Sequence, residues 1–596
     1  MRSAYAPGFI LAISVASQFT LSGVSASADC PADLSGDGLV DGQDIGLLFA
    51  NWGSRGPEGD LDQDGSVGGS DLGALMSAWG ECPAESNDTL LIPGTGFQGE
   101  TVELSPVGLP GEPGYENKPM ARWDVVPYQT VDQEFQVGIV AYHFGRIDRV
   151  EFSLDGGPWL PVNEMKQNPR TGQDEYWVTI DPSTMADGNH EIRAIVWPNV
   201  GTPRIMAGQI DDEAIRTGEH SLFLSSNHGR TLGSLDRWVS KDGSDQTGDG
   251  SREKPYASMM KAARSIQDEQ GKNADGGTIY LLPGSHSIGT YSWGLHTYVD
   301  DRWLTITHDP QTPMEKVLVT GVESLSGLRA KLLRFHRLNI QMPDDGSISQ
   351  YIFSSASGQS KWVSECNLNG PGRLADGDWG SGGVANYVTD TTIENCKRPF
   401  MGAIYRNIDL RHIGVDAMRG QICKLVLDVT VEDLNGCGSQ SGAHNDVLQF
   451  HAEVGAPPIS NGIYRGIISI GGSCSGQGIF FGTPATGEDL AFVDCIISNQ
   501  EDDEGYVARV MQFGGPVSHL VIEGCTLVGP ANWRSDQDFV TEAARITDSW
   551  FDYANTEFLI PYPDKHASFE PYDPEIHWDG SFPWKSPVQN VHYELN

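Results

Sequence analysis

Hydrophobic and polar positions alternate in short segments through the second half of the chain, and these segments recur at a nearly constant interval. The segments DAMRG, DVLQF, QGIFF and RVMQF begin at Asp416, Asp446, Gln477 and Arg509. Self-similarity at a fixed interval is typical of a solenoid, in which each repeat forms one coil. Residues 230–555 are therefore predicted to form a mainly β solenoid, and residues 556–596 a C-terminal capping tail.

The alternation also predicts which side chains face the core, because successive side chains of a strand point to opposite faces. The residues expected inside the coil are Met418, Leu448, Ile479, Met511, Phe450, Phe481 and Phe513. The residues expected outside, one above another, are Arg419, Gln449, Phe480 and Gln512. Such a column of cation, amides and one aromatic ring suits a carbohydrate groove, although an ordinary polar exterior has a similar composition.

Cysteines recur in the same repeats. Cys366 and Cys396 are separated by the same interval as Cys495 and Cys525, and Leu434 takes the same place between the two pairs. A stacked internal ladder of small buried thiols is the favoured interpretation, and a metal-binding or catalytic role is the alternative.

Upstream of the repeats the pattern is that of separate short strands. Val150, Phe152 and Leu154 alternate in a segment that ends in a turn signal, and the segments EYWVTID and EIRAIVW are expected to pair around Asp187-Gly188. Residues 97–220 are predicted to form a β-sandwich of the Ig-like or fibronectin-III-like kind, acting as a spacer, after a linker at residues 83–96.

Near the N-terminus the apolar positions change to a helical period. Ile45, Leu48, Phe49 and Trp52 form one stripe, and Leu72, Leu75, Met76 and Trp79 repeat it further along the chain. We expect the two stripes to pack together, because helices this short are marginal alone.

Each stripe follows a loop whose oxygens match a calcium loop, which needs ligands at positions 1, 3, 5, 7, 9 and 12. The first loop offers Asp33, Ser35, Asp37, the carbonyl of Leu39, Asp41 and Asp44. The second offers Asp60, Asp62, Asp64, the carbonyl of Ser66 and Asp71, with a water expected in place of Gly68. Hard oxygen ligands predict two calcium ions rather than zinc. A disulfide between Cys30 and Cys82 would close residues 29–82 as one module.

Charge and targeting signals narrow the setting. The chain has 39 Lys and Arg against 80 Asp and Glu, a formal net charge of −41, which argues against a nucleic-acid partner. Residues 1–28 have a basic start, an apolar stretch and an A-x-A signal, so they are predicted to be a secretory signal peptide cut near Ala28. No later segment is apolar over a length that spans a membrane, and the mature protein is expected to be secreted or cell-surface associated.

Two family resemblances follow. The duplicated loop and helix of residues 29–82 resemble a type I dockerin, which implies calcium binding and a cohesin-bearing scaffold or surface protein as partner, with a calcium-stiffened spacer as the alternative. The segment from Trp238 through the amphipathic stretch Met259, Ala262, Ala263 and Ile266 to Thr278 resembles the beginning of a right-handed parallel β-helix of the pectate-lyase-like superfamily. That resemblance implies a helix that covers the open end of the coil, and an activity on polysaccharide.

The densest candidate chemistry is GAHNDVLQFH, which resembles an H-x-D-x-x-Q pattern found on strands of some members of that superfamily. The candidate catalytic residues are His444, Asp446, His451, Arg419 and Tyr405, and the candidate substrate-binding residues are Gln449, Phe480, Gln512 and Arg411. The alternative is that His444 and Asp446 cap a turn and that His451 is only an exposed side chain. Arg406 and His412 are expected nearby. Asp376 and Asp378 could hold a further calcium in the β-helix or guard the groove, and a solvated loop is the favoured interpretation.

Three functions remain open. The first is β-elimination of a uronic-acid-containing polysaccharide, which needs a charge neutraliser, a base and an acid. The second is a glycan-binding or adhesin protein without catalysis. The third is a glycoside hydrolase that uses Asp416 and Asp446, which are one repeat apart.

Overall fold

The structure is a computed structural model of the 596-residue chain. The residues that it describes are 32, 34–35, 39–54, 59–62, 65–81, 89–94, 104–111, 115–210, 212–226, 235–270, 276–288, 302–320, 332–341, 360–370, 372, 386–396, 399, 402–420, 423–434, 445–452, 454–470, 477–482, 485–498, 510–515, 517–533, 544–547, 549–554 and 593–594. The chain divides into two compact units, Met1–Asp88 and Thr89–Asn596, and the division falls inside the linker predicted at residues 83–96.

The first unit contains two helices and a short antiparallel strand pair. Its elements are β1 (Leu39–Val40), α1 (Gly42–Ala50), α2 (Gly69–Ser77) and β2 (Gly80–Glu81). Val40, Leu48, Val67 and Leu75 belong to its buried core. The expectation that both apolar stripes pack inward is only half right. The exposed members are Phe49, Trp52, Met76 and Trp79, at 53, 47, 53 and 51%.

The second unit begins with a two-sheet β-sandwich. One sheet has the order β3 (Met120–Trp123), β5 (Phe135–Tyr142), β9 (Asp174–Ile180), β8 (Lys166–Gln167). The other has the order β4 (Thr130–Val131), β12 (Leu222–Ser226), β10 (Gly188–Pro198), β6 (Ile147–Leu154), β7 (Leu160–Val162), with β11 (Arg204–Met206) paired to β10. The alternation in β6 is confirmed, since Val150, Phe152 and Leu154 are fully buried between the sheets.

The predicted pairing of EYWVTID with EIRAIVW is wrong. These segments are β9 and β10, and they lie in different sheets. The short helix η2 (Pro182–Thr184) connects the two sheets, and its proline cannot donate to a hairpin ladder.

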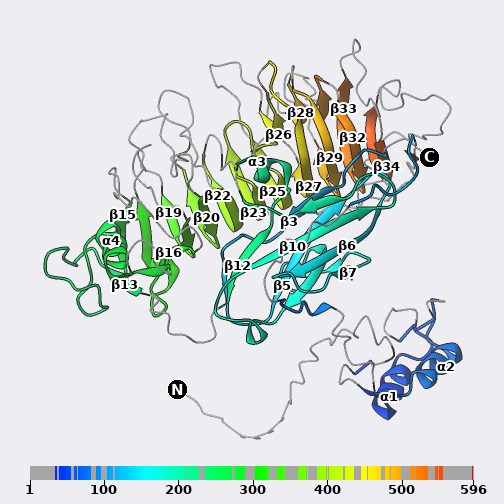
Figure 1. The fold of residues 1–596 in the computed structure, drawn as a ribbon, viewed down its shortest axis with the longest axis horizontal. Coiled ribbons are helices and arrows are strands. Elements are labelled where there is room, and N and C mark those ends of the chain that lie inside the picture. The colour runs from blue at the N-terminus through cyan, green and yellow to red at the C-terminus, as the bar shows by residue number, and fades with distance from the viewer. Residues whose placement is uncertain are drawn as a thin grey trace, which may run out of the picture. The chain divides into compact units, whose positions relative to one another are not determined.

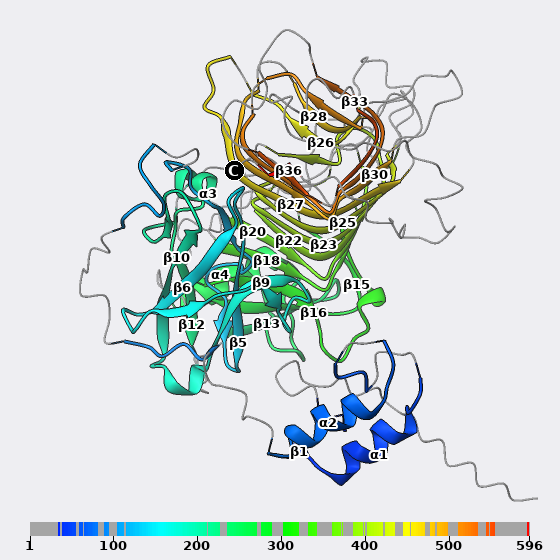
Figure 2. The same ribbon diagram turned by 90° about the vertical axis from the view of Figure 1, so that its right-hand side faces the viewer.

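The rest of the second unit is a parallel β-helix with three faces (Figure 1; Figure 2). The first face contains β13 (Leu235–Val239), β14 (Gly277–Leu281), β16 (Leu304–His308), β18 (Leu332–His336), β20 (Ser360–Ser364), β22 (Tyr387–Glu394), β23 (Ile404–Ile413), β25 (Leu425–Leu434), β27 (Ile459–Ile470), β29 (Gly487–Val493), β32 (Val517–Glu523) and β34 (Ala544–Thr547). The second face contains β15 (Gly284–Ser287), β17 (Val317–Thr320), β19 (Asn339–Gln341) and β21 (Asn367–Asn369), the second halves of β22, β23, β25 and β27, then β30 (Ile496–Ser498), β33 (Thr526–Trp533) and β35 (Trp550–Ala554). The third face contains β24 (Met418–Arg419), β26 (Asp446–Phe450), β28 (Gln477–Phe481), β31 (Met511–Phe513) and the end of β33.

Both ends of the β-helix carry an additional element. Helix α4 (Met259–Gln270) packs against β13 and β14, and its apolar side chains Met259, Ala262, Ala263 and Ile266 are buried in the same core as the coils. The predicted cap is therefore present at the first coil (Figure 1). At the other end β36 (Tyr593–Glu594) pairs antiparallel with β34. The remaining helices of the described residues are α3 (Asp212–Thr217) and η3 (Met314–Lys316).

A column of left-handed residues forms the corner between the first and second faces. Arg337, Glu365, Asp390, Asn407, Asp428, Gly466, Asp494 and Gly524 all have positive φ and lie in register on consecutive coils. Asp, Asn and Gly adopt this conformation more readily than other residues. From Asp390 onward a carboxylate alternates with Asn or Gly, so these like charges do not stack on neighbouring coils.

The cysteine ladder needs a correction. Residues directly after the corner column form one buried column, and its members are Leu338, Cys366, Thr391, Ile408, Val429, Ile467, Cys495 and Cys525. Cys396 and Leu434 are buried elsewhere, because the column position on the coil of Cys396 is held by Thr391. The equal intervals were misleading, since coils differ in length: Trp362, Tyr387 and Ile404 are equivalent positions of three successive coils.

The sandwich covers the outer side of the first face. Met120, Val140 and Tyr142 of the sandwich share one buried cluster with Trp362, Tyr387 and other outward residues of the first face. Because this seam is apolar and continuous with the sandwich sheet, the sandwich is an integral cover of the β-helix and not the spacer that the sequence predicted.

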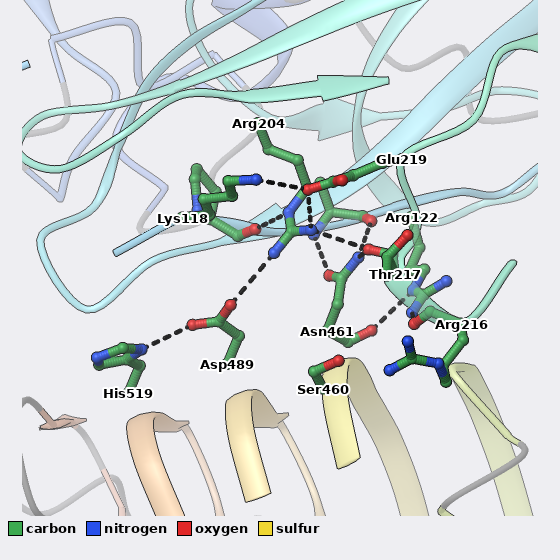
Figure 3. Close-up of polar contacts among 12 residues, drawn as sticks. Lys118, Arg122, Arg204, Arg216, Thr217, Glu219, Ser460, Asn461, Asp489 and His519 are labelled. Carbon is green, nitrogen blue, oxygen red and sulfur yellow. Dashed lines mark hydrogen bonds and ion pairs between the residues drawn. The ribbon is translucent and has the colours of Figure 1, made fainter. Parts of the chain in front are cut away.

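Two arginines of the sandwich form polar contacts with the β-helix at the edge of this seam (Figure 3). Arg204 donates from Nη2 to Asp489 Oδ2 at 3.2 Å, and Asp489 Oδ1 accepts from His519 Nδ1 at 2.9 Å. Arg122 donates to the carbonyls of Ile215 and Arg216, at the end of α3, and to Asn461 O at 2.7 Å. Cations at a helix C-terminus satisfy its last carbonyls and complement its dipole, so these contacts fix α3 between the two parts.

Candidate functional site

The outer column predicted on the third face is present in the expected register. The pairs Arg419–Gln449, Gln449–Phe480 and Phe480–Gln512 are direct neighbours on successive strands, and the column continues to Asn532. Arg419, Gln449 and Phe480 are half-buried, whereas Gln512 is only 6% exposed. Three of the four side chains therefore present a surface to solvent.

The opposite parity is also as predicted. Met418, Leu448, Ile479 and Met511 are buried inside the coil. Phe450 and Phe481 are fully buried and stack face to face, with ring centroids 3.9 Å apart and an angle of 5° between the planes. This internal stack fixes the direction of the neighbouring outward side chains. The side chain of Phe513, the last member predicted for the inner column, lies outside the described part.

Two buried carboxyl groups lie directly before the column. Asp416 and Asp446 occupy equivalent places on adjacent coils, and Ala417 N donates to Asp446 O at 2.8 Å. Their exposed fractions are 3% and 0%. Arg419 donates from both Nε and Nη2 to Asp416 Oδ2 at 3.2 Å, so Asp416 orients the guanidinium on the surface.

A histidine lies beside the column, directly after the end of β26. His451 is exposed, and a Cβ placed on Gly482 would lie 3.8 Å from its Nδ1 and 3.4 Å from Cε1 of Phe480. The imidazole of His451 and the ring of Phe480 therefore flank the same backbone position. His444, Asp376 and Asp378 lie outside the described residues.

Two predicted site residues are placed elsewhere. Tyr405 is fully buried inside the coil, in register between Val388 and Val426, and burial raises the pKa of its hydroxyl well above the usual value. Arg411 lies on the second face, where it contacts Asp409 at 3.3 Å and Glu432 at 3.5 Å.

The two neighbours expected beside them are also elsewhere. Arg406 pairs with Asp124 of the sandwich at 2.9 Å, and His412 pairs with Asp433 at 2.7 Å. Local sequence patterns could not place them, because β23 is one strand that spans two faces.

Sequence reasoning missed two polar side chains beside the carboxyl groups. Asn445 Oδ1 and Gln477 Oε1 are buried, and neither accepts a hydrogen bond from a described residue. Gln477 is in register with Asp446 on the next coil. The sequence could have indicated both residues, because they occupy positions next to Asp446 in the repeat.

In the first unit, the carboxylates at position 12 of both loops are fully buried. Asp44 accepts from Ser35 N at 2.9 Å and from Asp41 N at 2.7 Å, and so closes the first loop onto α1. Asp71 accepts from Gly68 N at 2.6 Å and Leu61 N at 2.7 Å in the second loop. The Gly68 amide is the main cause that lowers the pKa of Asp71, and burial opposes it.

The second loop brings three carboxylates together. One oxygen from each of Asp60, Asp62 and Asp71 lies within 4.8 Å of the others. Gly65 at position 6 has φ +87° and donates to Asp60 Oδ2 at 3.0 Å, as the sharp turn of a calcium loop requires. Converging hard oxygens fit calcium chemistry. The predicted ligands Asp33, Asp37 and Asp64 and the predicted Cys30–Cys82 disulfide lie outside the described residues.

Comparison with known proteins assigns no family to the chain. No protein-family model and no curated protein matches the chain. Among solved structures, the catalytic domain of a GH87 α-1,3-glucanase in complex with nigerose is 11% identical, with a TM-score of 0.27, over 70% of this chain and 78% of that one. A variant of a GH87 α-1,3-glucanase catalytic domain in complex with tetrasaccharides gives 11% identity and a TM-score of 0.20, over 70% of this chain and 77% of that one.

No helix in the described part of the chain combines the length and the apolar character needed to cross a membrane.

Proposed function

We propose that this chain is a secreted protein that degrades a uronic-acid-containing polysaccharide on the third face of its β-helix, by β-elimination. The observation that supports it is the outer column: an oriented guanidinium, an amide and a half-buried aromatic ring on three successive coils. In a chain of net charge −41, a fixed cation on this surface favours a substrate with carboxylate groups.

Five described residues have a role in that reaction. Arg419 binds the uronate carboxylate and draws charge from it, and Asp416 orients Arg419. The base removes the proton on the carbon beside the carboxylate, the electron pair forms a carbon–carbon double bond, and the bond to the leaving glycosidic oxygen breaks as that oxygen takes up a proton. His451 is the candidate base, and Gln449 and Phe480 hold the neighbouring sugars.

A specific observation favours one second candidate, a glycoside hydrolase. Asp416 and Asp446 are aligned on adjacent coils, and neighbouring strands are about 4.8 Å apart, close to the separation of a carboxylate pair that acts with retention. The almost complete burial of both side chains weighs against direct contact with a polymer, so this reaction ranks second.

The first unit is proposed to bind calcium and to dock on a cohesin-bearing partner. The carboxylates of Asp60, Asp62 and Asp71 support calcium binding. The exposed Trp52 and Trp79, at equivalent places of the duplicated unit, support docking through a protein surface.

The test is an assay of the mature chain on uronic-acid and neutral polysaccharides, with calcium or with chelator. Ultraviolet absorbance reports unsaturated uronate, and reducing ends are followed in parallel. We expect absorbance on an acidic glycan, and a 10- to 100-fold lower kcat/KM for Arg419→Ala, because a charge-assisted hydrogen bond contributes ~1.5–3 kcal/mol. Arg337→Ala is the matched control, since Arg337 is exposed at the corner between the first and second faces, away from the third face.

Each alternative outcome identifies one function. Reducing ends without absorbance, lost in Asp446→Asn, would replace the elimination with hydrolysis. Glycan binding without either product would leave a binding protein. An equal effect of Arg419→Ala and Arg337→Ala would refute the third-face site.

A further inference from the structure

A pair of acidic side chains is buried where the sandwich meets the β-helix. Asp124 follows β3 and is 1% exposed, and Glu175 in β9 is 0% exposed. Asp124 N donates to Gly138 O at 3.0 Å, and a Cβ placed on Gly138 would overlap Oε2 of Glu175. A glycine at this point of β5 therefore leaves room for the Glu175 carboxyl to lie over the strand, next to Asp124.

The hydrogen bonds around the two carboxyl groups leave one acceptor without a donor. Glu175 Oε1 accepts from Thr171 Oγ1 at 2.6 Å, and Glu175 Oε2 accepts from Asn168 Nδ2 at 2.9 Å. Asp124 Oδ1 accepts from Arg406 Nη1 at 2.9 Å. Asp124 Oδ2 is buried and accepts no hydrogen bond from a described residue. A buried acceptor without a donor is costly, and a neighbouring protonated carboxyl would supply one.

The charged groups around Asp124 and Glu175 also favour a proton on one of the two carboxyl groups. The cations near the pair are Arg170, Arg406 and Arg465. The carboxyl groups of the same cluster are Asp124, Glu175, Asp390 and Asp428, so acids outnumber bases by one. The Arg170 guanidinium donates to the main-chain carbonyls of Gln136 and Asp124, at 2.8 and 2.7 Å. One proton on the pair would balance the cluster.

The titration of Glu175 agrees with this count. Burial is the largest cause that raises the pKa of Glu175, from its usual 4.5 to about 8, and the negative charge of Asp124 is the next. Arg170 opposes the shift without cancelling it.

We propose that Glu175 and Asp124 share one proton at neutral pH, with Glu175 donating to Asp124 Oδ2, and that this proton holds the sandwich against β23 of the β-helix. Loss of the proton leaves two carboxylates in contact inside the seam, and Asp124 Oδ2 loses its only donor among the described residues. The contact between the sandwich and the β-helix is therefore pH-sensitive and weakens under alkaline conditions.

The direction of the pH dependence follows from linkage. The folded chain binds the proton of Glu175 more tightly than the unfolded chain does. Its stabilising effect is complete below pH 4.5, decreases as the pH rises, and is lost above about 8.

The experiment measures the urea midpoint of the full chain from pH 6 to pH 9.5, for wild type and Glu175→Gln. The amide of Gln donates to Asp124 Oδ2 at every pH, so the midpoint of the variant minus that of wild type, taken at the same pH, should increase as the pH rises from 6 to 9.5. Lys424, at another part of the seam with a pKa that burial lowers to about 7, titrates in both chains and cancels in the difference. Glu164→Gln, at an exposed sandwich position, is the control and should follow wild type.

A second measurement keeps the proposal testable if the variant does not fold. Hydrogen exchange of the amides in Met120–Trp123 and Ile404–Arg406, corrected for the intrinsic rate, should accelerate in wild type above pH 8. Identical pH profiles for wild type and Glu175→Gln, or exchange at the seam that does not change with pH, would overturn the proposal.

Discussion

Replacing two phenylalanines that are adjacent in the sequence should affect different properties: one replacement mainly lowers stability, and the other mainly weakens glycan binding. Phe481 points into the coil and stacks on Phe450, whereas Phe480 points out and lies in the candidate site. Phe481→Ala removes a fully buried ring and leaves a cavity, so we expect a loss of ~3–5 kcal/mol in the free energy of unfolding. The lost ring pair, worth ~1 kcal/mol, places the value in the upper half of that range.

Phe480→Ala should cost much less stability and more function. Full burial of a Phe side chain stabilises by ~1.5–3 kcal/mol, so a half-buried ring contributes about 1 kcal/mol. Removal of an aromatic platform should weaken glycan binding by up to about tenfold.

Both variants can be measured by urea unfolding followed by circular dichroism, and by glycan affinity in the absence of urea at a temperature where both are folded. A one-residue slip would exchange the two faces of the strand. If Phe480→Ala unfolds as easily as Phe481→Ala, the register of the third face, and the site built on it, is wrong.

Three further outcomes are expected. Gly466→Ala should destabilise more than Gly455→Ala, because both positions have positive φ but only the Cβ at residue 466 would collide with Asp428 Oδ1; equal urea midpoints would contradict this. Calcium at 100 times its dissociation constant should stabilise the first unit by ~2.7 kcal/mol for each occupied loop, and Asp71→Asn should abolish the contribution of the second loop. Calorimetric titration that shows no binding heat to wild type would refute the calcium site. Cys366 should resist alkylation in the native chain and react after denaturation, since burial raises the pKa of its thiol to about 12; rapid native labelling would show that the column is open.

The register of the third face could be predicted from the sequence, because each of its strands repeats the same alternation and the coils there have similar lengths. Met418, Leu448 and Ile479 indicated the inner column, and the outer column followed from parity. The cap helix was predictable for a similar reason, since its apolar side chains recur with a helical period and have only the end of the coil to cover.

The positions of Tyr405, Arg411 and Cys396 could not be predicted. They lie in β22 and β23 or just beyond, where the coils are short and one strand runs across two faces. Spacing alone cannot reveal such a bend. The usable signal was the corner column, in which Asp390 and Asn407 precede the inward residues and adopt positive φ.

The seam was invisible to sequence reasoning for a different reason. Its apolar side chains are ordinary outward positions of β-strands, and only the tertiary structure shows that two sheets meet there. The charged part of the seam, from Arg204 to Asp489, joins residues that no local pattern connects.

The seam also constrains the order in which the chain can fold. Arg122 and Asn461, which bond across it, are separated by 339 positions, and the sandwich leaves the ribosome first. A solenoid can grow coil by coil from local contacts, whereas a contact of such high sequence separation forms slowly. The part of the β3-β5-β9-β8 sheet that packs against β27 therefore stays uncovered until β27 has been synthesised. During that interval its apolar surface is the part of the nascent chain that most needs a chaperone.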